Sequence, residues 1–183
     1  MNVTLTPIAG VMLVETPLRE DHRGAFGRLY CDRELADLAG TRQVVQVNQS
    51  RTRQIGAVRG LHFQHAPHAE MKFVRCLRGR VWDVAVDLRA GSPTFLHWHA
   101  QELRADRPAM LVIPEGCAHG FQVLEADSEL LYLHTAHYDP DAEGGLRHDD
   151  PRLAITWPLP VADLSERDRA HPLLSPDFAG LDV

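Results

Sequence analysis

The sequence predicts an all-β protein that folds as a jelly-roll β-barrel with a few short helices. Two observations lead to this prediction. Short runs in which apolar and polar residues alternate recur along the chain, and Gly, Pro, Asp or Asn bounds each run, which is typical of antiparallel strands. The runs are also evenly spaced, and closure into a barrel is how an antiparallel sheet removes its exposed edges.

The clearest pair of strands is predicted as a hairpin. It joins residues 72–77 to residues 81–88 through Arg78-Gly79, where the glycine can take the positive φ of a tight turn. The second strand alternates, with an apolar face and a face that carries two aspartates, Asp83 and Asp87. The other predicted strands span residues 45–50, 59–64, 94–102, 109–113, 120–124 and 130–136.

Helix signals are few and short. Residues 32–38 carry a brief apolar stripe, and Ser165-Glu166-Arg167-Asp168 begins like a capped helix. No repeat, low-complexity tract or long run of charge interrupts the chain. We therefore expect one domain over residues 1–183.

Composition excludes several classes of protein. The 183 residues carry a formal net charge of −6, which argues against a general affinity for nucleic acid. Cys31, Cys76 and Cys117 are an odd number at irregular spacing, so neither a disulfide framework nor a zinc knuckle is indicated. The chain has no apolar run of about 18 residues and no basic-apolar leader, so we expect no membrane partner and a cytoplasmic location.

Polar residues occupy strand faces where a dry barrel would be apolar. In residues 45–50, Gln46, Asn48 and Ser50 share one face, and in residues 59–64 His62 and Gln64 do the same. A solvated outer face is the simpler explanation for one such strand. Because several strands share the pattern, the sequence predicts a polar pocket at the barrel mouth.

Five residues supply the chemistry for such a pocket. His62 is a candidate base, Lys72 a cation and His119 a second imidazole. Tyr132 adds a phenol, and Asp168 is a carboxylate that can orient a histidine. Together they are the groups needed to take a proton from a carbon next to a carbonyl.

Ordered motifs give the chain a family resemblance. They are Asp21-His22-Arg23-Gly24, Gln46-Val47-Asn48-Gln49-Ser50, Val58-Arg59-Gly60-Leu61-His62-Phe63-Gln64, the stretch 83–95, Ile113-Pro114-Glu115-Gly116-Cys117-Ala118-His119-Gly120-Phe121 and Leu164-Ser165-Glu166-Arg167-Asp168. With these motifs the chain resembles the dTDP-4-dehydrorhamnose 3,5-epimerases, sugar-nucleotide enzymes of the cupin superfamily, over about residues 18–172.

The resemblance implies a reaction and the residues that perform it. The substrate would be a dTDP-linked 4-keto-6-deoxyhexose, with epimerisation at C3 and C5, which flank the ketone. His62 matches the base, and Asp168 matches the acid that pairs with it. Lys72 matches the cation near the developing enolate oxygen, and Tyr132 matches the group that returns a proton on the opposite face.

The resemblance also implies binding residues, a partner and the absence of a cofactor. The positions that match substrate contacts are Arg23, Phe26, Gln46, Asn48, Arg59, His119, Tyr138 and Glu143. A homodimer is expected, in which the strands of about residues 1–45 are shared and Arg23 of one chain reaches the neighbouring site. Residues of about 160–183 are expected to pack on the barrel. No cofactor or metal is expected, since the substrate's own ketone accepts the electrons.

Departures from the family pattern leave alternatives open. Ala25, Arg28, His137, Gly144 and His148 replace residues that are common in the family, so the nucleotide and the number of carbons epimerised stay open. C3-only or C5-only epimerisation is one alternative. A metal-dependent cupin is another, because His97-Trp98-His99 resembles a ligand pair, and a non-catalytic sugar-nucleotide binder is a third.

Overall fold

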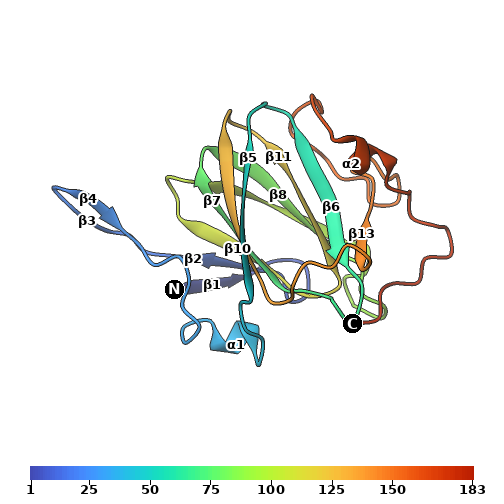
Figure 1. The fold of residues 1–183 in the computed structure, drawn as a ribbon, viewed down its shortest axis with the longest axis horizontal. Helices are drawn as coiled ribbons and strands as arrows, with labels where there is room; N and C mark the ends of the chain where they lie inside the picture. The colour runs from blue at the N-terminus through green and yellow to red at the C-terminus, as the bar shows by residue number, and fades with distance from the viewer.

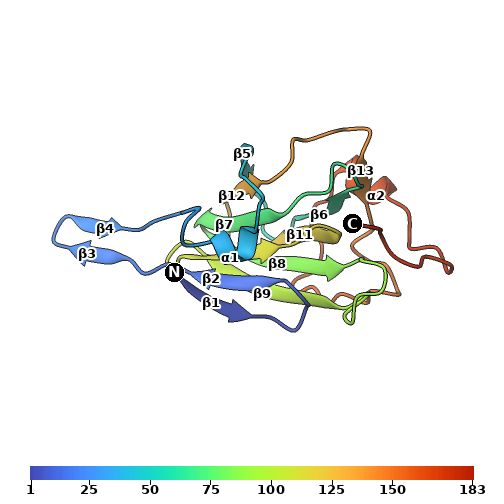
Figure 2. The ribbon, with the colours of Figure 1, turned by 90° about the horizontal axis from the view of Figure 1, so that it is seen from below.

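The computed structural model describes residues 1–183 as two facing antiparallel sheets, which confirms the predicted jelly roll (Figures 1 and 2). One sheet has the strand order β1 (Asn2–Leu5), β2 (Met12–Glu15), β10 (Ala109–Ile113), β7 (Lys72–Arg78), β12 (Ser128–His134) and β5 (Gln46–Thr52). The other has the order β13 (Glu143–Gly145), β6 (Val58–Gln64), β11 (Cys117–Val123), β8 (Arg80–Asp87) and β9 (Trp98–Arg104). A separate hairpin joins β3 (Arg19–Asp21) to β4 (Gly24–Phe26).

The predicted hairpin between β7 and β8 is wrong in one respect. Gly79 does make a tight turn at φ +73°, but β7 and β8 belong to different sheets. The backbone around the turn bonds to other loops: Gly79 accepts from the Ala105 N–H, and Arg80 donates to the Ser128 hydroxyl. The turn is therefore a corner at which the chain changes sheets.

The predicted strand 94–102 begins later than expected, at Trp98. Residues 94–97 form turns, because the buried Asp87 carboxylate accepts hydrogen bonds from the hydroxyls of Ser92 and Thr94 at 2.5 and 2.6 Å. Leu96 completes the bend with a positive φ of 60°. Side-chain bonding of this kind competes with the ladder of a strand.

Only two short helices form. The first, α1 (Ala36–Ala39), is shorter than the predicted stripe of residues 32–38, and α2 (Glu166–Ala170) begins where the sequence predicts. The Ser165 hydroxyl caps α2 by accepting from the Asp168 N–H at 3.0 Å. No helix is long and apolar enough to cross a membrane.

The core lies in three layers. Between the sheets, Val74, Leu111 and Leu130 pack against Val81 and Phe121 of the facing sheet. On the outer face of the five-stranded sheet, buried side chains of β6 and β8 pack against the chain that follows β13; the residues concerned are Leu61, Val84, Val86, Leu88, Leu146, Leu153, Leu174 and Leu181. The outer face of the six-stranded sheet is covered by the segment around α1. Because the central strands β7, β10, β8 and β11 are covered on both faces, the barrel walls are fixed and can hold polar groups in place.

The β3–β4 hairpin stands away from this body (Figures 1 and 2). Its strands pair only with each other, and all six strand residues are exposed. Phe26 is 73% exposed, and the Arg23 side chain, 78% exposed, pairs with Asp21 at 2.6 Å. An isolated hairpin is marginally stable in water, so this one lacks a supporting surface within the chain.

Candidate active site

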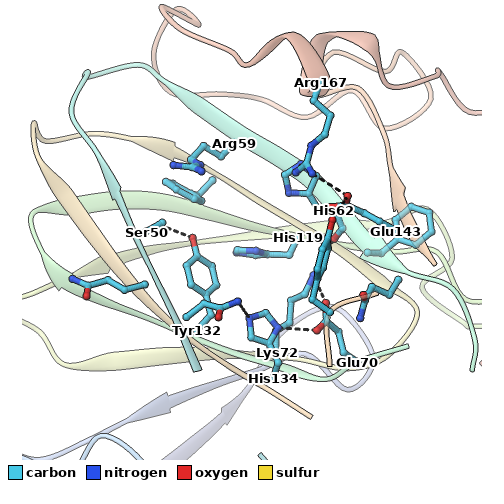
Figure 3. Close-up of a pocket in the computed structure, with 16 residues that line it drawn as sticks. Ser50, Arg59, His62, Glu70, Lys72, His119, Tyr132, His134, Glu143 and Arg167 are labelled. Atoms are coloured by element: carbon cyan, nitrogen blue, oxygen red, sulfur yellow. Dashed lines mark hydrogen bonds and ion pairs between the residues drawn. The ribbon is translucent and has the colours of Figure 1, made fainter. Parts of the chain in front are cut away.

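A cavity of about 270 Å³ opens at one end of the barrel, between the two sheets (Figure 3). Strands β5, β7 and β12 line it from one sheet, and β6, β11 and β13 line it from the other. His62, Lys72, His119 and Tyr132 all line this cavity, so the structure brings together four of the side chains that the sequence singled out.

His62 and Asp168 form a dyad at the edge of the cavity. His62 Nε2 lies 2.6 Å from Asp168 Oδ1, and Asp168 Oδ2 accepts from the Gly60 N–H at 3.3 Å. Asp168 is buried; burial raises the pKa of its carboxyl, but the His62 hydrogen bond and charge outweigh this and leave the pKa below its ordinary value. A carboxylate in this place fixes the tautomer of His62 and stabilises an imidazolium. His62 Nδ1 has no hydrogen-bond partner in the protein and is free to take a proton.

A bulge in β6 aims two of its side chains into the same cavity. Arg59 and His62 are three residues apart, so in a regular strand they would face opposite ways. Between them the pairing of β6 with β11 shifts by one residue, and both side chains line the cavity. The shift occurs at Gly60, whose φ is +121°. Only glycine fits there, because a Cβ would lie 2.6 Å from the Gly120 Cα.

Lys72 lies at the floor of the cavity and is the only lysine in the chain. Its ammonium donates to the His62 carbonyl oxygen at 3.2 Å and pairs with Glu70 at 3.2 Å. Glu70 also accepts from His134 Nδ1 at 2.7 Å, and all three side chains are about nine-tenths buried. Burial raises the pKa of Glu70, but the His134 hydrogen bond and the Lys72 charge outweigh it, so the pKa lies below its ordinary value.

Two further pairs complete the polar wall. The hydroxyls of Tyr132 and Ser50 are 2.9 Å apart, and His119 Nε2 lies 2.8 Å from Asp83 Oδ1. Burial raises the pKa of Tyr132, so its phenol is protonated at neutral pH and is able to give a proton. The rings of His119 and Tyr132 meet edge-on, with centroids 6.0 Å apart.

The predicted binding residues divide into two groups. Asn48, Arg59, Tyr138 and Glu143 line the cavity beside the base. Gln46 stands just behind them and accepts from the Tyr138 N–H at 3.0 Å.

Arg23 and Phe26 form the second group, and the structure does not bring them to this cavity. They lie on the projecting hairpin, where Phe26 lines a separate, smaller cavity with Arg28. Arg28 pairs there with Glu34. A role for these residues in a neighbouring chain's site stays a prediction.

Several residues in the cavity wall or directly behind it were missed from the sequence. Glu70, Asp83 and His134 each hold a predicted residue or its neighbour, and Arg167 pairs with Glu143 at 2.9 Å and lies 3.5 Å from His62 Nε2. Their signal in the sequence was weak: Glu70 lies two residues before Lys72, and His134 two after Tyr132.

The histidines of the metal-dependent alternative lie elsewhere. His97 lies in the turn before β9 and His99 lies on β9, and neither lines the cavity. The one group of three side chains that could ligate a metal joins His171 to the His62–Asp168 dyad, with ligand atoms within 4.8 Å of one another. Arg167 lies beside it, so a cation entering the dyad would meet an existing positive charge.

Fold and site together define a class: the chain is a cupin-type isomerase, with acid and base groups placed to move protons at carbon next to a carbonyl. The comparisons with known proteins specify it further. The model of the family described as dTDP-4-dehydrorhamnose 3,5-epimerase matches residues 5–176. The chain therefore belongs to the dTDP-4-dehydrorhamnose 3,5-epimerase family, and it is an epimerase.

Relatives and solved structures agree with this assignment. The epimerase of Sinorhizobium fredii is 43% identical over 168 residues, which cover 91% of this chain and 86% of the relative. A Legionella pneumophila epimerase in complex with dTDP-4-keto-L-rhamnose superposes with a TM-score of 0.89, at 39% identity over 94% of this chain and 92% of that one. A Streptomyces bikiniensis 3'-monoepimerase in complex with dTDP-quinovose has a TM-score of 0.84, at 33% identity over 92% and 85%.

Proposed function

We propose that this enzyme converts dTDP-4-dehydro-6-deoxyglucose to dTDP-4-dehydrorhamnose by inverting C3 and C5, in the biosynthesis of dTDP-rhamnose. The observation that carries the proposal is the joint placement of the His62–Asp168 dyad and the Lys72 ammonium. The Lys72 ammonium on β7 donates to the His62 carbonyl oxygen on β6, so cation and base meet in one cavity although their strands belong to facing sheets. A hexose bound between them would meet both.

The mechanism follows from the geometry. His62 takes the proton from C3 or C5, and the C–H electron pair moves into the C4 ketone, so that an enolate forms. Lys72 stabilises the negative oxygen more than it stabilises the neutral ketone, which lowers the barrier. Tyr132 then gives its proton to the carbon from the opposite ring face, which inverts the centre. Positioned base catalysis contributes roughly 10²- to 10⁴-fold.

Arg59 is the proposed anchor for the diphosphate, since arginine forks match phosphate oxygens. It lines the cavity close to the dyad and, apart from a weak 3.5 Å contact with the Thr52 hydroxyl, has no protein partner. Asn48, His119, Tyr138 and Glu143 would then contact the sugar. Binding energy from the remote nucleotide orients the reacting ring.

Deuterium exchange tests the reaction. In D₂O the enzyme should place deuterium at C3 and C5 of the 4-keto-6-deoxyglucose nucleotide, and His62→Asn should stop exchange at both carbons. Label at C3 alone would instead support C3-only epimerisation, which the similarity to a 3'-monoepimerase keeps as the second candidate. Absence of label above a blank would refute catalysis and leave a binding function.

The proposal includes a homodimer with exchanged N-terminal strands. The β3–β4 hairpin has no surface to rest on in its own chain, and the edge strands β1 and β5 expose Leu5 and Val47 at 78% and 58%. A second copy would cover these apolar groups and place Arg23 at its neighbour's cavity. The cytoplasmic location stays a prediction from the sequence.

Complementation tests this arrangement. Arg23→Ala and His62→Asn should each lose activity alone, whereas co-expressed chains should form mixed dimers that contain one intact site. Light scattering should give twice the mass of the chain. A monomer that is fully active at micromolar concentration would refute the exchange.

A further inference from the structure

The floor of the cavity is a continuous row of hydrogen-bonded groups, of which the proposed function uses only the two ends, Asn48 and Lys72. The row begins at Asn48, whose amide lies 3.4 Å from His134 Nε2. It continues from His134 Nδ1 to Glu70 and from Glu70 to Lys72, at 2.7 and 3.2 Å (Figure 3). Glu70 is its centre, because each carboxylate oxygen takes one partner.

We propose that Glu70 is a positioning residue of this active site, which holds the Lys72 ammonium in its charged form and aims it at the substrate oxygen. The inference rests on the proposed function, in which Lys72 stabilises the enolate. Glu70 itself makes no bond to the substrate in this proposal. It acts through Lys72.

The need for such a residue follows from burial. A lysine side chain removed from water loses its hydration, and without a nearby anion it gives up its proton. Neutral lysine would offer the enolate no positive charge. The side chains of Lys72 and Glu70 are each only 8% exposed, and Glu70 provides the carboxylate that pairs with the ammonium.

The other charged groups around the cavity do not substitute for Glu70. Besides Glu70, the titratable side chains that line it with Lys72 are Arg59, His62, His119, Tyr132, His134, Tyr138, Glu143 and Arg167. Glu143 is already paired with Arg167, Asp168 with His62 and Asp83 with His119. On β11, Cys117 is a neutral thiol, since burial raises its pKa to about 12.

His134 gives Glu70 its orientation. With Asn48 donating to Nε2, the Nδ1 proton of a neutral His134 points to Glu70. This leaves the second carboxylate oxygen of Glu70 for Lys72. His134 also stacks on Tyr132 with ring centroids 6.0 Å apart, so the same residue connects the cation to the proton donor.

The single lysine makes a direct test feasible. In protein labelled with ¹⁵N and ¹³C only in lysine, NMR gives one side-chain ammonium to titrate, without substrate. In Glu70→Gln, which keeps the shape but removes the charge, Lys72 should titrate about one pH unit or more below wild type. Glu125→Gln, at an exposed glutamate with no ion pair, is the matched control and should titrate like wild type.

Kinetics provide the second readout. Glu70→Gln should lower kcat about tenfold or more at pH 8 with little change in KM, and the upper limb of its pH profile should move down together with the Lys72 titration. Glu70→Asp keeps the charge, so its upper limb should stay near that of wild type even if kcat falls. A merely structural role would move neither the limb nor the titration.

The outcomes separate this inference from the proposed function. If Lys72 titrates in Glu70→Gln as in wild type, the inference is wrong, whatever the enzyme does to a sugar nucleotide. If wild-type protein exchanges no deuterium, the proposed function fails, while the titration still decides the role of Glu70. Should Glu70→Gln not fold, Glu70→Ala is titrated instead with Glu70→Asp as the charged control, and a Lys72 that titrates in Glu70→Ala as in wild type would overturn the inference.

Discussion

Replacing Asp168 by asparagine should damage the enzyme more than replacing it by alanine. The reason lies in the Gly60 N–H, which donates to Asp168 Oδ2 while Oδ1 faces His62 Nε2. An asparagine in this position would turn its carbonyl oxygen toward the Gly60 N–H, because two donors cannot face each other. Its amide would then donate to His62 Nε2, so the imidazole would carry its proton on Nδ1. That nitrogen could no longer accept a proton from carbon.

The expected magnitudes differ accordingly. Alanine removes a charge-assisted hydrogen bond, worth about 1.5–3 kcal/mol, or roughly 10- to 150-fold in rate, but leaves His62 free to choose its tautomer. Asparagine removes the general base itself, which contributes roughly 10²- to 10⁴-fold. We therefore expect Asp168→Asn to fall below Asp168→Ala in kcat.

Deuterium incorporation into the substrate, followed by NMR at C3 and C5, measures both rates directly. Thermal unfolding and dTDP binding serve as controls that each variant is folded, since Asp168 is buried. Asn and Ala variants that exchange equally fast would contradict the tautomer argument. Exchange at the wild-type rate in either variant would refute the pairing of Asp168 with His62 as part of catalysis.

Three further predictions follow from the structure. Tyr132→Phe should incorporate deuterium with retention of configuration and yield almost no epimer, because the proton on His62 would exchange with D₂O and His62 would return a deuteron to the same face. Product formed at the wild-type rate would contradict the role of the phenol. Arg59→Ala should weaken dTDP binding by roughly 10- to 150-fold in calorimetry, the loss of one hydrogen bond to a charged group, and unchanged affinity would place the diphosphate elsewhere. Burial opposes ionisation of Asp87, but hydrogen bonds from Arg89, Ser92 and Thr94 lower its pKa from 3.8 to about 2. The ionised carboxylate therefore contributes about 2 kcal/mol to the free energy of unfolding above pH 4, and this contribution is lost as the pH falls toward 2. Asp87→Asn should therefore lower the free energy of unfolding at pH 7 by up to that amount and flatten its decline in acid, as denaturant titrations would show.

Much of the barrel could be predicted because its strands alternate strongly. The stretches that became β6, β10 and β12 each place apolar residues at the spacing of a strand, and their predicted bounds differ from the structure by two residues or fewer. Asp83 and Asp87 are correctly predicted to lie opposite the apolar face of β8, which packs against Leu174 and Leu181.

The errors have physical causes beyond the reach of local pattern. Gly79 indicates a tight turn. Whether that turn forms a hairpin or a corner between sheets depends on which loops form hydrogen bonds with its backbone. Residues 94–97 alternate like a strand, yet the Asp87 carboxylate folds them into turns. The short strands β3, β4 and β13 have too few residues for a period to show.

The site was predicted in part for a similar reason. His62, Lys72 and Tyr132 stand out because a polar group on a barrel strand needs an explanation. Glu70 and His134 lie outside that pattern, since Glu70 precedes its strand and His134 ends one. Only the three-dimensional pairing of β12 with β7, which sets His134 opposite Lys72, shows that they act together.

The bulge in β6 also fixes the distance between two side chains of the site. Arg59 and His62 stand opposite Phe121 and His119 of β11, which are two residues apart, so the bulge sets a span of about 7 Å that loop motion cannot change. For a substrate whose anionic linker binds Arg59, this span selects the length of the linker. A pyrophosphate linker would bring the hexose up to the His62 imidazole, whereas a single-phosphate ester would hold the ring away from it. The main chain of β6 would therefore discriminate between linkers, and other parts of the molecule would recognise the nucleobase.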